Sequence, residues 1–220
     1  MSRSLPLSVA LLALGVTLAV PSAPVAAQVD LSVRNSFPGR RIGGNTRSRN
    51  ICWTRQFAHL VPVDSVIAPG QPVTIGLLEG PSNSPRLLQI DLQSLGPGGQ
   101  IDPGARPLLQ RRLPPAPAGI TLLTLPPFQQ PLSWSTSYVC DEAPPPPDDP
   151  LYFITSGEPP AVSLLVPGPP SAADRSNQEA LERLSRSCGS SVSQREVMQL
   201  FGFTDLEGPH WPLSLPVRCL

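Results

Sequence analysis

The chain has 220 residues, of which 31 are proline and 17 are glycine, and its formal net charge is zero. Because neither sign of charge dominates, the composition gives no reason to expect nucleic acid or a charged membrane surface as the partner. All 16 basic residues are arginines, which excludes a P-loop lysine, a Schiff-base lysine and a Ser-x-x-Lys nucleophile.

Residues 1–27 have the pattern of a secretory signal peptide. Arg3 precedes the apolar run LPLSVALLALGVTLAV, and the small residues Val25 and Ala27 favour cleavage after Ala27. The run is shorter than the roughly 20 apolar residues of a membrane-spanning helix. We therefore expect an exported protein of the periplasm, the cell surface or the extracellular space, without a transmembrane segment in the mature chain.

A basic, glycine-containing lead-in follows over residues 28–57. Its glycines do not lie between a strand and a helix, so no phosphate-binding loop is predicted. Arginines in such number are suited to bidentate contacts with an anionic glycan or with a protein partner. The alternative is that they bond loop carbonyls or pair with acids of the main domain, such as Asp64 and Glu79. The candidate partner-binding residues are Arg40, Arg41, Arg47 and Arg49.

Residues 58–166 are predicted to form the main domain. Short apolar runs alternate with glycine and proline turns, and Leu88, Ile90 and Leu92 alternate with polar residues at the period of a strand. The pattern predicts a mainly β fold, an antiparallel sandwich of immunoglobulin-like or jelly-roll-like type with a short helical C-terminal tail. The expected strands lie at 58–63, 72–78, 86–95, 119–126, 132–140, 151–155 and 161–167, with a poor edge strand at 105–114.

The proline run at 141–150 is predicted to be a polyproline II spacer. A proline-rich linker at 167–175 then leads to the helical tail at 176–220. Capping boxes at Ser176–Glu179 and Ser193–Glu196 mark the expected starts of two short helices.

The tail also contains a helix-ending glycine and two acid–arginine pairs. Gly202 is placed to end the second helix. On the first helix, two acid–arginine pairs have the i, i+4 spacing of surface ion pairs, which contribute a few tenths of a kcal/mol each. These pairs are Glu179 with Arg183 and Glu182 with Arg186. The tail is expected to pack against the main domain.

Four cysteines remain after the expected cleavage, Cys52, Cys140, Cys188 and Cys219. An even number in an exported protein indicates two disulfides. Zinc is not expected, because no two of these cysteines have the short spacing of structural zinc ligands. Three connectivities are possible. We favour Cys52–Cys140 with Cys188–Cys219, because each pair then encloses one compositional region.

The sequence contains no catalytic, cofactor-binding or metal-binding motif that we recognise. Of the two histidines, His59 lies in an apolar run and is predicted to be a core or rim residue rather than a catalyst, while His210 lies in a turn. No Gly-x-Ser-x-Gly elbow is present to place a nucleophilic serine. We therefore expect a non-catalytic envelope or surface module that binds a protein or an anionic glycan. The alternative is a secreted hydrolase whose site joins a histidine, a carboxylate and a serine.

Several segments resemble a family of exported cyanobacterial proteins known only as a domain of unknown function. They are GRRIGGNTR (39–47), Cys52, LVP (60–62), GITLLTLPP (119–127) and LSWSTSYVCDE (132–142). The resemblance covers roughly residues 36–166 and implies an exported β-rich domain with Cys52 near Cys140. It implies no activity. The chain departs from the family in its proline run and in a short tail with its own cysteine pair.

Overall fold

A computed structural model describes most of the chain between Arg41 and Leu220. The expected signal peptide, Cys52, Cys140, the proline run and the expected strand at 151–155 lie outside the described residues. The described residues are 41–43, 55–96, 99–101, 104, 106–139, 161–206 and 210–220.

The described chain is mainly β, as predicted, and forms two sheets. In spatial order, the first sheet contains β1 (Ile42–Gly43), β2 (Phe57–Leu60), β4 (Val73–Glu79), β7 (Gly119–Leu125), β11 (Ser214–Cys219) and β10 (Ser191–Ser193). The second contains β3 (Val66–Ile67), β9 (Ala161–Pro167), β8 (Leu132–Tyr138), β5 (Leu88–Ser94) and β6 (Leu109–Leu113).

Both sheets are mixed. Most neighbouring strands run antiparallel, but β11 is parallel to β7 and β3 is parallel to β9. Parallel neighbours need a long connection between them. The segment between β7 and β11 supplies one, since it contains β8, β9 and all the described helices.

The inner faces of the two sheets enclose one hydrophobic core. Leu88, Ile90 and Leu92 are buried there, whereas the intervening residues of β5 are half-buried, as the period-two pattern predicts. Trp134 of β8 is completely buried in this core. The edge position predicted for the strand around Leu109 is also confirmed, because β6 ends the second sheet.

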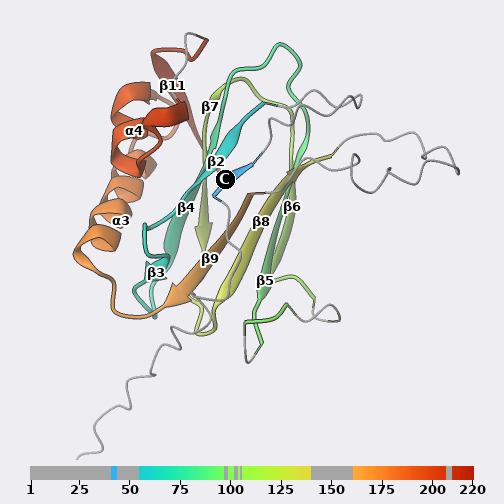
Figure 1. Cartoon of the computed structure of the whole chain (residues 1–220), viewed down its shortest axis with the longest axis vertical. Helices are drawn as coiled ribbons and strands as arrows, with labels where there is room; N and C mark the ends of the chain where they lie inside the picture. The colour runs from blue at the N-terminus through green and yellow to red at the C-terminus, as the bar shows by residue number, and fades with distance from the viewer. Residues whose placement is uncertain are drawn as a thin grey trace, which may run out of the picture.

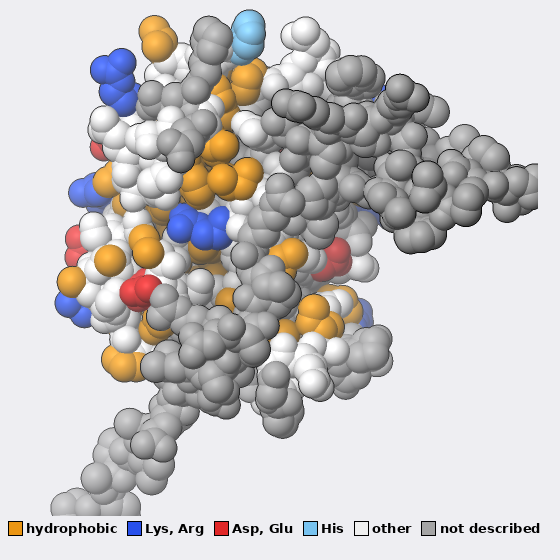
Figure 2. Space-filling view, in the orientation of Figure 1, with side chains coloured by type: hydrophobic (Ala, Val, Ile, Leu, Met, Phe, Trp, Pro, Cys, Tyr) orange, Lys and Arg blue, Asp and Glu red, His pale blue; other side chains and the backbone are white. Residues whose placement is uncertain are grey.

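Two helices, α3 (Ala172–Ser185) and α4 (Gln194–Phe201), cover the outer face of the first sheet (Figure 1). Together with the short 3-10 helix η1 (Thr204–Leu206), they form what we call the helical layer. A second hydrophobic core lies beneath it, and Figure 2 shows apolar side chains gathered between the helices and the sheet. Strands β2 and β4 are therefore buried on both faces, which explains their continuous apolar runs.

The start of α3 differs from the prediction. The N-cap is Ser171, whose hydroxyl accepts from the Asp174 backbone N–H at 3.1 Å, while Asp174 accepts from the Ser171 N–H at 3.2 Å. The helix begins at Ala172, so Ser176 lies within it and the predicted linker is too long. Asp174 also accepts from the backbone N–H of Asp64 at 2.7 Å, which ties this helix end to the turn after β2.

The start and end of α4 are as predicted. The hydroxyl of Ser193 caps the backbone N–H of Glu196, and Gly202 ends the helix with φ of 69°, a left-handed conformation that favours glycine. No helix in the described part of the chain combines the length and apolar character needed to cross a bilayer.

A disulfide joins Cys188 to Cys219, as predicted, with 5.7 Å between their Cα atoms. It connects the turn after α3 to the end of β11. The C-terminal segment thus supplies strands of the first sheet and also the helices that cover that sheet. The pairing of Cys52 with Cys140 remains a prediction. Described residues close to them in sequence do meet, because the Tyr138 hydroxyl donates to the Arg55 carbonyl at 3.1 Å.

Candidate functional site

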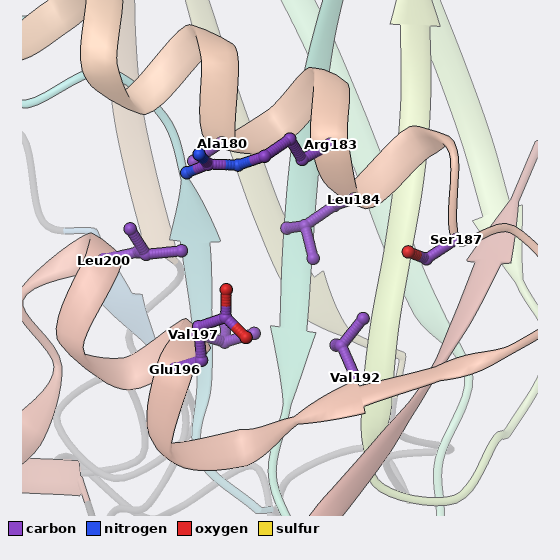
Figure 3. Close-up of a pocket in the computed structure, with 8 residues that line it drawn as sticks. All are labelled: Ala180, Arg183, Leu184, Ser187, Val192, Glu196, Val197 and Leu200. Carbon is purple, nitrogen blue, oxygen red and sulfur yellow. The ribbon is translucent and has the colours of Figure 1, made fainter.

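A hollow of about 150 Å³ opens in the helical layer between α3, α4 and β10 (Figure 3). We call it the helical hollow. Most of its wall is aliphatic, and one arginine, one glutamate and one serine complete it. The lining residues are Ala180, Arg183, Leu184 and Ser187 from α3 and the turn after it, Val192 from β10, and Glu196, Val197 and Leu200 from α4.

Local sequence explains why this space exists. Residues 180, 183, 184 and 187 recur at helical spacing along α3, and Ala180 offers only a methyl group to the wall. After the helix, Gly189 takes a φ of 77° and turns the chain into β10. The second helix therefore starts beside the first, and a gap remains above the residues that pack on the sheet.

Arg183 and Glu196 carry the charges of the hollow. Both are exposed, and Figure 3 shows Arg183 extended along α3 and Glu196 turned toward that helix. The predicted pairs Glu179–Arg183 and Glu182–Arg186 are wrong, because the ion pairs among the described residues all involve Glu79. An exposed i, i+4 pair gains too little to hold two long side chains in one geometry.

The size of the hollow limits what it can hold. Sites for drug-sized ligands usually measure about 300–1,000 Å³. The helical hollow, at about 150 Å³, is smaller and suits a single large apolar side chain. Its aliphatic wall would remove such a side chain from water, while the two rim charges would face polar groups beside it.

His59 is a core residue, as predicted, and is not accessible to solvent. Its Nδ1 lies 2.9 Å from the Ser163 hydroxyl, its Nε2 lies 2.9 Å from the Thr136 hydroxyl, and its ring stacks on Trp134 at 3.6 Å. Burial, together with the positive charge of Arg41, holds the pKa of His59 well below its ordinary value. The ring therefore links the two sheets as a neutral group, and its described partners are hydroxyls.

Glu79 is the centre of a buried ion network at one end of β4. It pairs with Arg55, and its Oε2 lies 2.9 Å from the guanidinium of Arg218 on β11. Arg55 also donates to the Gly80 carbonyl at 3.0 Å. Burial raises the pKa of Glu79, and the two guanidinium groups oppose this rise. The network joins the lead-in, β4 and β11.

Arg41 is the one candidate partner-binding arginine among the described residues. Its guanidinium donates to the Phe201 carbonyl at 3.4 Å and lies over the Phe203 ring at 4.9 Å from the centroid. These contacts hold β1 against the end of α4. Arg41 thus bonds a carbonyl and Arg55 pairs with Glu79, as the alternative interpretation expects. Arg40, Arg47 and Arg49 lie outside the described residues.

No pattern in the sequence predicted the helical hollow. The available signal was a charged residue next to an apolar one on each helix. These residues are Arg183 next to Leu184 and Glu196 next to Val197, and all four line the hollow. A helical periodicity shows which residues share a face. It does not show how far apart two such faces lie, so the space between them could not be predicted.

No family model, curated protein or solved structure matches the chain. Among the residues that the structure describes, no three histidine, cysteine, aspartate or glutamate side chains are grouped to hold a metal ion. The lining and the volume of the hollow are therefore the observations that bear on function.

Proposed function

We propose that the protein is an exported, non-catalytic module of the cell envelope or surface that binds another protein through the helical hollow. One observation carries this proposal: a hollow the size of one side chain has an aliphatic wall and two rim charges that make no ion pair within the described chain. An apolar anchor in a pocket, surrounded by polar contacts, is the usual core of a protein interface.

We also propose a fold type and a location for the protein. An immunoglobulin-like or jelly-roll-like sandwich agrees with two sheets around a common core, and the resemblance to exported cyanobacterial proteins agrees with the expected signal peptide. Cys188 and Cys219 are both exposed. A disulfide in such a position persists in an oxidising compartment, which favours export.

A protein partner fits the hollow better than an anionic glycan does. The rim charges are opposite in sign, so the hollow offers no net positive charge to a polyanion. Arg41, the described member of the arginine group, is already engaged with Phe201 and Phe203. We therefore place the partner site on the helical layer rather than on the lead-in.

Two matched pairs of variants test the proposal. Leu200→Arg puts a charge on the wall of the hollow, and Leu108→Arg makes the same change at an exposed leucine next to β6 of the other sheet. Arg183→Glu reverses a rim charge, and Arg186→Glu does so at an exposed position of the turn after α3 that does not line the hollow.

The purified protein is incubated with envelope extract of the source organism, and bound proteins are identified by mass spectrometry. We expect Leu200→Arg and Arg183→Glu to weaken binding of the identified partner at least tenfold, which corresponds to about 1.4 kcal/mol. The two control variants should bind as the unmodified protein does. Equal binding by all variants that keep the native circular dichroism spectrum would refute the assignment to the hollow.

A further inference from the structure

Among the described strands, β10 has no neighbour on its outer side, so it is an open edge of the first sheet, next to the helical hollow. It pairs with β11 on one side, with Val192 opposite Leu215, and it stands last in the strand order. Ser191 and Ser193 are exposed on this strand, and Val192 between them lines the hollow. The same three residues thus form both a sheet edge and part of the wall of the hollow.

Backbone hydrogen bonds show which groups face the open side. The Gln194 N–H donates to the Leu213 carbonyl at 3.0 Å, and the Val217 N–H donates to the Ser190 carbonyl at 2.8 Å. In an antiparallel pair, successive residues direct their backbone groups alternately toward the partner and away from it. Residues 190 and 194 face β11, so Ser191 directs its N–H and carbonyl to the open side.

Two of the four edge strands of the described sheets, β6 and β10, differ in their protection. Sheets commonly guard an exposed edge with charged residues or proline, which discourage the addition of another strand. Strand β6, one edge of the second sheet, carries the exposed arginines Arg111 and Arg112. Strand β10 carries serines on either side of Val192 and has neither a charge nor a proline.

An added strand would bring a side chain to the hollow. Residues opposite each other on neighbouring strands point to the same face, with Cβ atoms about 4.5–5.5 Å apart. A residue opposite Val192 would therefore point to the face that lines the hollow. A branched aliphatic side chain suits its volume and its aliphatic wall.

The rim charges define the rest of the ligand. Arg183 and Glu196 lie on opposite helices of the hollow and make no side-chain ion pair within the described chain. A segment complementary to both carries one acidic and one basic residue near its aliphatic residue. In an extended segment, these residues must lie two positions away to share its face.

From these observations we infer that β10 and the helical hollow together bind an extended peptide segment of a protein partner. The segment adds to the open edge of β10 as a further strand and inserts a branched aliphatic side chain into the hollow. This inference rests on the proposed function and specifies how the partner is held. Because β10 has three residues, main-chain hydrogen bonds are few, and the inserted side chain supplies most of the affinity.

A synthetic probe tests this inference without knowledge of the partner. It is a fluorescein-labelled peptide of seven residues, with leucine at the centre, glutamate two positions before it, lysine two positions after it, and threonine elsewhere. Threonine favours an extended conformation. Fluorescence anisotropy should show binding to the full chain. Replacing the leucine by serine should weaken binding at least tenfold, because the hollow would then no longer remove an apolar side chain from water.

Ser191→Pro tests the strand addition, because it removes an N–H on the open side, and Ser191→Ala is the matched control that keeps this N–H. We expect the proline variant to bind the peptide about three- to tenfold more weakly, in keeping with one lost hydrogen bond. The alanine variant should bind normally. In the unmodified protein, amide hydrogen exchange at Ser191 should slow when the peptide is added, a result that does not depend on the folding of any variant.

Two results would overturn the inference. One is the absence of peptide binding to the unmodified protein at millimolar concentration. The other is binding that neither protects the Ser191 amide nor responds to Ser191→Pro in a folded variant. In either case the capture experiment with Leu200→Arg decides separately whether the hollow binds a protein, so the two proposals fail independently.

Discussion

The inter-sheet core and the helical layer differ in how completely their polar side chains are enclosed and paired. Between the sheets, Trp134 and His59 are enclosed, and both ring nitrogens of His59 lie within hydrogen-bonding distance of hydroxyls. In the helical layer, a hollow remains open, and Arg183 and Glu196 stand at its rim. The closed core is suited to hold the fold together, and the incomplete layer is suited to recognise a partner.

The difference also separates stability from function. Substitutions in the inter-sheet core should change the free energy of unfolding strongly, whereas exposed charges such as Arg183 should change it by about 0.5 kcal/mol or less. Sites that bind commonly lie where packing is left unfinished, because a fully packed surface has no room for a ligand. Three measurements test this separation.

The largest effect is expected for Trp134→Ala. Trp134 is completely buried and stacks on His59, so its removal leaves a cavity and should cost about 3–5 kcal/mol of unfolding free energy. We expect amide protection to fall in both sheets and in the helices, because the helices pack on a sheet that this core holds in place. Chemical denaturation and hydrogen-exchange mass spectrometry provide the measurement.

Phe201→Ala is the matched comparison, since Phe201 is also a buried aromatic residue, but it belongs to α4 and packs in the core between the helical layer and the first sheet. Here we expect protection to fall mainly in α3, α4 and β11, while β5 and β8 keep theirs. The comparison breaks down if both variants lose protection in the same segments. That outcome would mean that the two layers unfold as one cooperative unit.

The next largest effect is expected when the disulfide between Cys188 and Cys219 is removed by replacing both residues with serine. It closes a loop with a sequence separation of 31 residues. In the chain-entropy model such a loop is worth about 3–4 kcal/mol, an upper figure. For a chain of this size we expect a fall in Tm of roughly 10 °C, with loss of amide protection in the helical layer. Differential scanning calorimetry measures the shift.

A reductant supplies the control for this variant. Dithiothreitol should lower the Tm of the unmodified protein by at least as much as the double substitution does. Any further fall that dithiothreitol causes in the double variant reports a second disulfide, as expected if Cys52 pairs with Cys140. An unchanged Tm in the double variant without reductant would show that the bond does not support the helical layer.

Sequence patterns predicted the inter-sheet core better than the helical layer. Alternation in β5 identified Leu88, Ile90 and Leu92 as buried, because period-two patterning is a local property of the chain. The capping serine of α4 and its final glycine are local signals too, and they predicted that helix. The parallel pairing of β11 with β7 is a contact between segments far apart in sequence, which no local pattern contains.

Two further differences between expectation and structure have separate origins. The start of α3 was missed because its capping box uses Asp174 rather than the usual glutamate or glutamine. Arg41 was a candidate partner-binding residue from composition alone, and that role stays a prediction; its described contacts are with Phe201 and Phe203, some 160 residues away in sequence. Such contacts depend on how separate elements are placed, which the sequence around Arg41 does not reveal.

The smallest of the three effects concerns pH and tests whether the inter-sheet core is closed. Because the pKa of His59 is held well below its ordinary value near 6.5, the folded protein keeps this ring neutral where the unfolded chain takes up a proton. Stability should therefore fall as the pH drops below about 6.5, by at most about 2 kcal/mol down to about pH 5. Urea denaturation at a series of pH values measures this fall.

His59→Gln isolates the contribution of the histidine. Glutamine keeps a donor and an acceptor that can meet the hydroxyls of Ser163 and Thr136, but it does not titrate. The variant should be less stable at neutral pH because it loses the stack on Trp134, and it should lose less stability on acidification. If both proteins show the same pH profile, His59 takes up its proton in the folded state as readily as in the unfolded chain. Water would then have to reach the ring, and the contrast between a closed core and an open helical layer would not hold.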